Sequence, residues 1–375
     1  MRKESIWCRQ KEAPMKRQAN FEVLRMLAMA MIVAMHFMQK GGILQPLSED
    51  RTAVNASAWL IEAFCIVAAN CYVLISGYFL VDAQWKLNKL LKLVMQVLFY
   101  SFLIPVVCYV CGIGEVRSWS VYDWITAILP FQMDHYWFAT AYVLLFALSP
   151  VLAAGVKQLS KKQLEITIGL LLVYFCLFKS ISPVLLATDH YGYDYPWFIC
   201  LFLIAAYIRL YGADQGGITI GRWRLLETAK KSMLIYVGIT AFIFILSLVL
   251  GVFTEKYGKF AYYMDMLFSY NHILTLLASI ACFSAFLQWE PKENGMIRML
   301  CKAAPYTFGV YLLHENIAIR NLWQSLFLTD RARESFLYLP CMLIAIICVF
   351  AAGVLTDFIR NIIFTKIGNR KGRTS

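Results

Sequence analysis

The stretch "NFEVLRMLAMAMIVAMHFMQK", residues 20–40, is apolar enough to cross a membrane as a helix, yet it contains Glu22, Arg25 and His36. His36 follows Arg25 by eleven positions, which places it about 16 Å further along a helix axis. Eleven positions are close to three full turns, so these three side chains share one helix face. A cation near one end suits a phosphorylated donor, and a deeper neutral imidazole can take a proton from a hydroxyl.

Simpler interpretations of these residues stay open. Arg25 could be a topology anchor that reaches the lipid headgroups, and Glu22 could be its i,i+3 partner. His36 could hydrogen-bond a neighbouring helix. An ionisable residue inside a span costs about 3 kcal/mol on insertion scales. Each of the three must therefore face protein, water or a ligand.

Four residues in other apolar stretches could join the same chemistry. Ser76 in "ISGYF" either allows close helix packing or helps to present a backbone N–H to the donor or an oxyanion. His314, followed by Glu315, falls near mid-depth and either lines an active cavity or satisfies a buried polar network. His135 and Trp137 fall at the outer boundary of a span, where interfacial aromatic residues occur regardless of function. Substrate contact is the alternative for both.

Two further features have no single interpretation. Glu62 lies near the outer end of the second apolar stretch, and its role is open. The loop "DHYGYDYPWF" at 189–198 gathers aromatic rings and two aspartates on the same outer side. Such a group suits a sugar, and interfacial anchoring explains it equally well.

The elements that would position these residues are membrane-crossing helices. The chain has 375 residues, of which 60% are hydrophobic and 15% charged, and its mean hydropathy is +0.61, so a soluble domain is excluded. A span needs about 20 mostly apolar residues. The sequence predicts an all-α polytopic membrane protein of about ten transmembrane helices, at 21–38, 57–80, 90–111, 136–156, 164–179, 197–211, 232–252, 266–288, 305–327 and 336–358.

The distribution of basic residues predicts the orientation. Most of the 35 Lys and Arg residues fall in the termini and in every second loop, which places both termini in the cytoplasm. Residues 1–19 form a basic cytoplasmic segment that we do not interpret as a cleavable signal peptide, and 366–375 form a basic cytoplasmic tail. This topology explains the net charge of +12, so nucleic-acid binding is an unnecessary interpretation.

Cysteine and histidine usage predicts no metal centre. The eleven cysteines mostly lie singly in apolar runs, where cysteine behaves as a small hydrophobic residue. Cys108 and Cys111 in "CYVC" sit inside a span, which favours structural filling over redox or metal chemistry. The sequence contains no second such pair and no His-rich cluster.

An ordered set of motifs resembles the membrane-bound acyltransferase-3 family. The Arg-x10-His spacing from Arg25 to His36 is similar to that family's first-span signature. The other similar segments follow in the family's order: "ANCYVLISGYFL" at 69–80, "HYWFATAYVLLFALSP" at 135–150, "YTFGVYLLHEN" at 306–316 and "TDFIRNIIF" at 356–364. The resemblance covers essentially the whole chain and implies a single transmembrane acyltransferase-3 domain over 20–365.

The resemblance implies a membrane O-acyltransferase of the bacterial cytoplasmic membrane. Its donor would be cytosolic acyl-CoA, with acetyl-CoA expected, and its acceptor a hydroxyl of a cell-envelope glycan or of a lipid-linked precursor. Polysaccharide-synthesis proteins are the expected partners, alongside membrane lipid. The expected donor contacts are Arg25 and Ser76, the catalytic residues His36 and His314, and the acceptor contacts His135 and Trp137.

Two alternatives remain at this point. His36 could act as a general base on the acceptor hydroxyl, or it could carry the acyl group itself. A transporter or flippase-like protein for glycan precursors could also place buried His and Arg along its path. Transporters commonly contain repeats, and the two halves of this sequence show no clear similarity, which favours the enzyme.

Overall fold

The computed structural model describes residues 18–133, 135–183, 190–212, 218–220 and 223–371. The predicted N-terminal segment at 1–19 therefore lies almost wholly outside the described residues, and so does 372–375 of the predicted tail. The first part of that tail, 366–371, continues the last helix.

Within the described residues, eight helical segments are long and apolar enough to cross a membrane, in agreement with the predicted polytopic helical fold. Several of them combine two shorter helices or end in a π-helical turn. The segments are α1 (Ala19–Lys40), α2 (Ala53–Cys65) with α3 (Ala68–Leu80), α4 (Leu87–Cys111), α6 (Trp137–Gln158), α7 (Lys161–Leu172) with α8 (Phe178–Ile181), α9 (Tyr195–Tyr207) extended to Gly212, α10 (Ala229–Tyr257) and α16 (Tyr338–Lys371).

Two of the ten predicted spans are shorter than expected. The stretch 266–288 contains α12 (Ile273–Leu287), an apolar helix of 15 residues that follows the short α11 (Ala261–Met266). The stretch 305–327 is broken, because α14 (Thr307–His314) ends at His314 and turns follow it. The side chain of Asn316 accepts from the backbone N–H of Ala318 at 3.0 Å. Such local side-chain bonds compete with helix continuation.

The remaining described elements are short. They are α5 (Val121–Ile128), α13 (Gly295–Ala303), α15 (Thr329–Ala332), and 3-10 turns at Val116–Ser118, Ala304–Tyr306 and Trp323–Phe327. One antiparallel hairpin, β1 (Ile218–Ile220) with β2 (Trp223–Leu226), is the exception to the helical fold among the described residues. It is too small to change the fold class.

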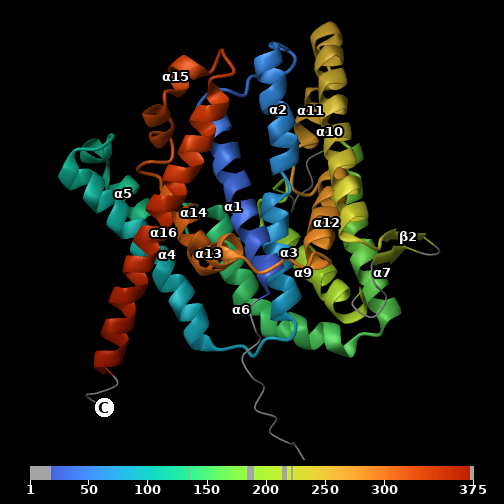
Figure 1. The fold of residues 1–375 in the computed structure, drawn as a ribbon, viewed down its shortest axis with the longest axis horizontal. Helices are drawn as coiled ribbons and strands as arrows, with labels where there is room; N and C mark the ends of the chain where they lie inside the picture. The colour runs from blue at the N-terminus through green and yellow to red at the C-terminus, as the bar shows by residue number, and fades with distance from the viewer. Residues whose placement is uncertain (1–17, 134, 184–189, 213–217, 221–222, 372–375) are drawn as a thin grey trace, which may run out of the picture.

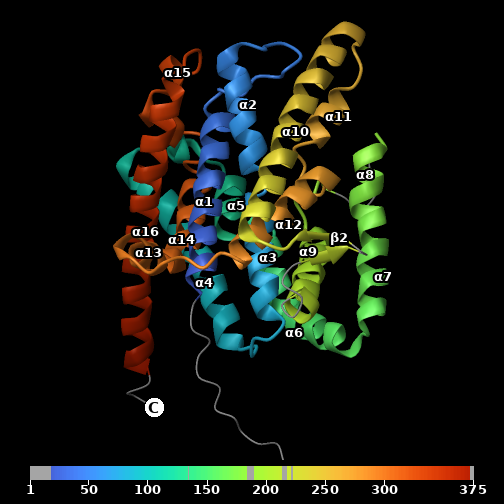
Figure 2. The same cartoon turned by 45° about the vertical axis from the view of Figure 1, so that its right-hand side comes forward.

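Helix α1 lies inside the bundle. It packs against α2, α3, α12, α14 and α16 (Figure 1). In Figure 2, α16 stands at one edge of the bundle and α7 with α8 at the other. The apolar window of α1 is 61% buried, compared with 28% for that of α16. The polar residues of α1 therefore face protein and internal space instead of lipid, as buried ionisable groups require.

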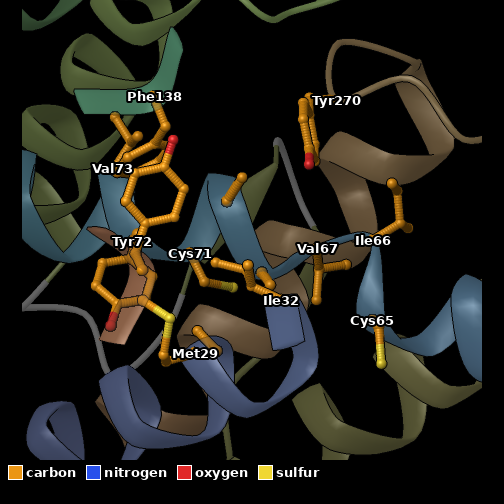
Figure 3. Packing of buried hydrophobic residues seen from close by; sticks show 14 of the residues in the cluster. Met29, Ile32, Cys65, Ile66, Val67, Cys71, Tyr72, Val73, Phe138 and Tyr270 are labelled. Carbon is orange, nitrogen blue, oxygen red and sulfur yellow. The ribbon is translucent and has the colours of Figure 1, made fainter. Parts of the chain in front are cut away.

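Close contact between α1, α3 and α9 forms the centre of the core. Figure 3 shows Met29 of α1 beside Tyr72 of α3. On the other side of α3, a Cβ added at Gly77 would lie 2.9 Å from the Cβ of Ala205 in α9. Glycine therefore lets the two helices approach closely, as one of the two interpretations of "ISGYF" expects.

Candidate active site

His36 is the centre of a polar cluster that joins α1 to the end of α14. Its Nδ1 lies 3.0 Å from Nε2 of His314 and 3.1 Å from Oε1 of Glu315. The side chains of His36 and Glu315 are 16% and 11% exposed, and His314 is buried. The break in α14 produces this arrangement, because Glu315 follows the last helical residue. Two residues separated by 278 positions in the chain thus form one hydrogen-bonded unit.

The hydrogen bonds determine which nitrogen of each imidazole carries a proton. Nδ1 of His314 lies 2.7 Å from the carbonyl oxygen of Val310, which can only accept, so this nitrogen is protonated. Nε2 of neutral His314 is therefore an acceptor. Nδ1 of His36 must then donate, either to His314 or to the Glu315 carboxylate. In neutral His36 this leaves Nε2 as the unprotonated nitrogen, the form that a general base requires.

Lys40 completes the cluster one turn further along α1. Its ammonium forms an ion pair with the same oxygen of Glu315 that His36 contacts. A neighbouring cation stabilises the ionised carboxylate, and that carboxylate in turn stabilises the imidazolium that His36 forms when it takes a proton. His314 and Glu315 both contact Nδ1 of His36, the position from which the orienting carboxylate of a catalytic triad holds its histidine.

A cavity of about 870 Å³ lies beside His36, at the end of α1 that the charge pattern places outside the cytoplasm. This size falls in the range of small-molecule sites. His36, Gln39, Lys40 and Glu315 line one part of the cavity, and Glu62 of α2 lines it as well. His36 is thus placed where a molecule entering the cavity can meet it.

Aromatic rings form much of the remaining cavity wall. Trp137 stacks on Tyr270 with ring centroids 5.6 Å apart, and Tyr193 lies 4.7 Å from both rings. Trp59 and Phe268 form a second pair at 4.7 Å. All of these residues line the cavity. The wall offers flat apolar faces beside polar groups, a combination that fixes and orients an amphipathic ligand.

The same cluster could hold a metal ion. Donor atoms of His36, His314 and Glu315 lie within 4.8 Å of one another, the only such group in the described part of the chain. The ammonium of Lys40 already neutralises Glu315, which lowers its value as a metal ligand. Absence of a metal stays a prediction.

Comparison with known proteins identifies the family. The family model described as an acyltransferase domain, that of the acyltransferase-3 family, matches residues 18–355. The chain belongs to the acyltransferase-3 family. Among proteins of curated function and among solved structures, nothing matches it. The cluster around His36 is therefore a candidate active site within a membrane acyltransferase domain.

Arg25 lies at the other end of α1 in this acyltransferase-3 domain. Its Nη1 contacts Oε1 of Glu22 at 2.8 Å, so the local i,i+3 partner predicted for it is confirmed. The side chain of Arg25 is 28% exposed while that of Glu22 is 4% exposed. Arg25 does not line the cavity beside His36. A role in donor binding stays a prediction.

Ser76 of α3 lies in the same half of the domain as Arg25, where Phe21 of α1 contacts Tyr78 and Phe79 of α3. Its hydroxyl bonds within the protein. The hydroxyl can donate to the carbonyl of Tyr72 at 2.9 Å or to the hydroxyl of Tyr142 at 3.2 Å. Ser76 is 8% exposed. A contact with the donor through Ser76 stays a prediction, and the packing at Gly77 supports a structural part for this turn.

His135 is separate from the candidate site. It is buried and does not line the cavity, whereas its neighbour Trp137 does. The N–H of Ile317 donates to its Nε2 at 3.0 Å, and its Nδ1 lies 3.2 Å from the hydroxyl of Ser101. Burial, together with the smaller effect of the nearby Arg320 charge, lowers the pKa of His135 to about 3. A neutral His135 thus holds the segment after α14, and its predicted contact with substrate has no support in this arrangement.

Sequence reasoning missed several residues of the site. Gln39 and Lys40 follow His36 by three and four positions, so helical spacing alone could have placed them on its face. The sequence pattern assigned no role to Glu62. Tyr270 carried no signal, because the turn between α11 and α12 that positions it was predicted to be part of a continuous span.

Proposed function

We propose that this acyltransferase-3 protein is a membrane O-acyltransferase that moves an acyl group, with acetyl expected, from cytosolic acyl-CoA to a hydroxyl of a cell-envelope glycan or its lipid-linked precursor. The observation that carries the proposal is the fixed tautomer of His36, which leaves an unprotonated Nε2 on a residue that lines a ligand-sized cavity. The bacterial cytoplasmic membrane is the proposed location, and polysaccharide-synthesis proteins are the proposed partners.

In the proposed reaction the acceptor enters the cavity from the outer side. Nε2 of His36 takes the proton of the acceptor hydroxyl while its oxygen bonds to the carbonyl carbon of the acyl thioester. The carbon–sulfur bond then breaks, and the CoA thiolate leaves with the proton that His36 returns. His314 and Glu315 hold the imidazole in the required tautomer and stabilise its charged form.

Arg25 and Ser76 are the proposed donor contacts on the cytoplasmic side. The guanidinium of Arg25 is partly exposed and can form bidentate bonds to a CoA phosphate. The two proposed substrates would thus approach from opposite ends of α1. In this proposal the thioester reaches His36 from the inner side, and no metal takes part.

Trp137 and the rings around it support a glycan as the acceptor. Sugar rings pack on aromatic faces through their apolar C–H surfaces, while their hydroxyls need polar partners. The cavity supplies both, with Trp137, Tyr193 and Tyr270 beside Gln39 and Glu62.

The test is transfer of labelled acetyl from acetyl-CoA to glycan in membranes that contain the wild type, His36→Ala or the control His190→Ala. His190 is an exposed histidine in the loop that precedes α9. We expect His36→Ala to lose about 100-fold or more of the activity and His190→Ala to keep it. Equal transfer by wild type and His36→Ala would remove His36 from the mechanism. Glycan movement across the membrane without CoA-dependent transfer would favour the transporter.

A further inference from the structure

Gln39 and Glu62 form a polar pair that the proposed reaction does not use. The amide Nε2 of Gln39 in α1 donates to Oε1 of Glu62 in α2 at 2.6 Å. A carboxylate only accepts, so this contact fixes the orientation of the Gln39 amide. Its carbonyl oxygen and its second N–H are then held in defined directions.

Glu62 occupies an unusual environment for a carboxyl group. It is 1% exposed, it lies in the last turn of α2, and its Oε2 has no hydrogen-bond partner among the described residues. Burying a polar atom without a partner is unfavourable for folding. A hydrophobic residue would fill this position with less cost, so the fold itself does not explain Glu62.

Gln39 differs from Glu62 in that it is exposed and faces usable space. Both residues line the cavity beside His36. Gln39 follows His36 by three positions, so it lies on the same helix face, about one turn nearer the outer end. Side chains three positions apart on a helix are neighbours, with Cβ atoms about 5–6 Å apart, so one sugar ring can present one hydroxyl to His36 and another to Gln39.

The aromatic wall belongs to the same cavity. Glu62, Tyr193 and Tyr270 all line it, and the two tyrosine rings contact Trp137. A sugar packed on these rings would occupy the cavity that His36 and Gln39 also line. Its hydroxyls could donate to the amide oxygen of Gln39 or accept from its N–H.

We infer that Gln39 binds a hydroxyl next to the one that is acylated, and that Glu62 is the positioning residue that orients the Gln39 amide. The pair thereby decides which hydroxyl of the acceptor meets His36. This inference rests on the proposed acyl transfer and adds its regioselectivity to it. The acceptor class is a glycan with at least two free hydroxyls on the reacting sugar.

The test uses the glycan that wild-type membranes acylate in the transfer assay, and the position of the new ester is read by NMR. Glu62→Gln keeps the shape of the side chain but lets the Gln39 amide adopt either orientation, because an amide both donates and accepts. Gln39→Ala removes the contact. Glu255→Gln is the matched control, since Glu255 is a carboxylate that is more than half exposed and does not line the cavity.

We expect one regioisomer from wild type and from Glu255→Gln, and a mixture from Glu62→Gln and Gln39→Ala. The acceptor KM should rise about tenfold in Gln39→Ala, while the donor KM stays unchanged. A single regioisomer in all variants, or a mixture already in wild type, would overturn the inference. No transfer by wild type would instead contradict the proposed function. If Gln39→Ala fails to fold, the isosteric Glu62→Gln still gives the answer.

Discussion

The two ends of α1 solve the problem of a charged residue in a membrane helix in different ways. At the inner end, Arg25 pairs with Glu22 on its own helix. At the outer end, the partners of His36 and Lys40 lie at the end of α14, in His314 and the next residue, and the partner of Gln39 lies on α2. A pair within one helix can form without the rest of the fold, whereas a cluster built from three segments forms only when the bundle is folded. The candidate active site is therefore the cluster at the outer end of α1.

The largest effect should come from removing the carboxylate of the outer cluster. Glu315→Gln leaves Lys40 without its ion pair and removes the negative charge that stabilises protonated His36. We expect kcat to fall about 100-fold or more, because orienting carboxylates in triads have effects of at least this size. The measurement is acetyl transfer at saturating donor and acceptor.

Glu255→Gln is the control for that substitution. Glu255 pairs with Arg51 but is more than half exposed, so its loss should leave kcat unchanged. If Glu315→Gln behaved like this control, the outer cluster would be a structural network and the contrast between the two ends of α1 would disappear.

A smaller and different effect is expected at the inner end. Arg25→Ala should raise the KM for acyl-CoA about tenfold, because a charged hydrogen bond to a phosphate is lost, and kcat should change little. Arg209→Ala is the matched control. Its side chain has the same exposure of 28% and pairs with Asp82. An unchanged donor KM in Arg25→Ala would mean that Arg25 is a topology anchor only.

The smallest effect is expected for Ser76→Ala, in the same half of the domain as Arg25. Loss of the contact with Tyr142 should lower the free energy of unfolding by about 1 kcal/mol, and the donor KM should rise less than it does in Arg25→Ala. Thermal unfolding in detergent and donor titration measure the two effects. The control Ser247→Ala removes a buried hydroxyl that bonds only within α10. A donor KM above that of Arg25→Ala would make Ser76 the main donor contact.

Local features of the sequence were predictable because their partners lie within one helical turn. The Glu22–Arg25 pair and the pair of Asp357 with Arg360, at 2.7 Å, both follow from an i,i+3 spacing. The membrane class followed from apolar length alone. Family membership followed from the order of several weak motifs, and the match over 18–355 confirms it.

The long-range part of the site was not predictable from spacing. His36 and His314 were both expected to act in catalysis, but nothing in the sequence says that their rings meet. The break after α14 was hidden, because 305–327 is apolar enough to continue as a helix. In the same way, Asn70 of α3 accepts from the indole N–H of Trp197 in α9 at 3.0 Å. Which helix would supply that partner depended on packing that no short pattern encodes.

The central claim is that His36 and His314 act as one unit, with His314 holding His36 in its catalytic tautomer. A double-mutant cycle of His36→Ala and His314→Ala, read as kcat for acetyl transfer, tests it most directly. Residues that act as a unit give strongly non-additive losses. We therefore expect the double variant to be no slower than His36→Ala alone. Losses that multiply, so that the double variant is slower by the product of the two single effects, would contradict the claim.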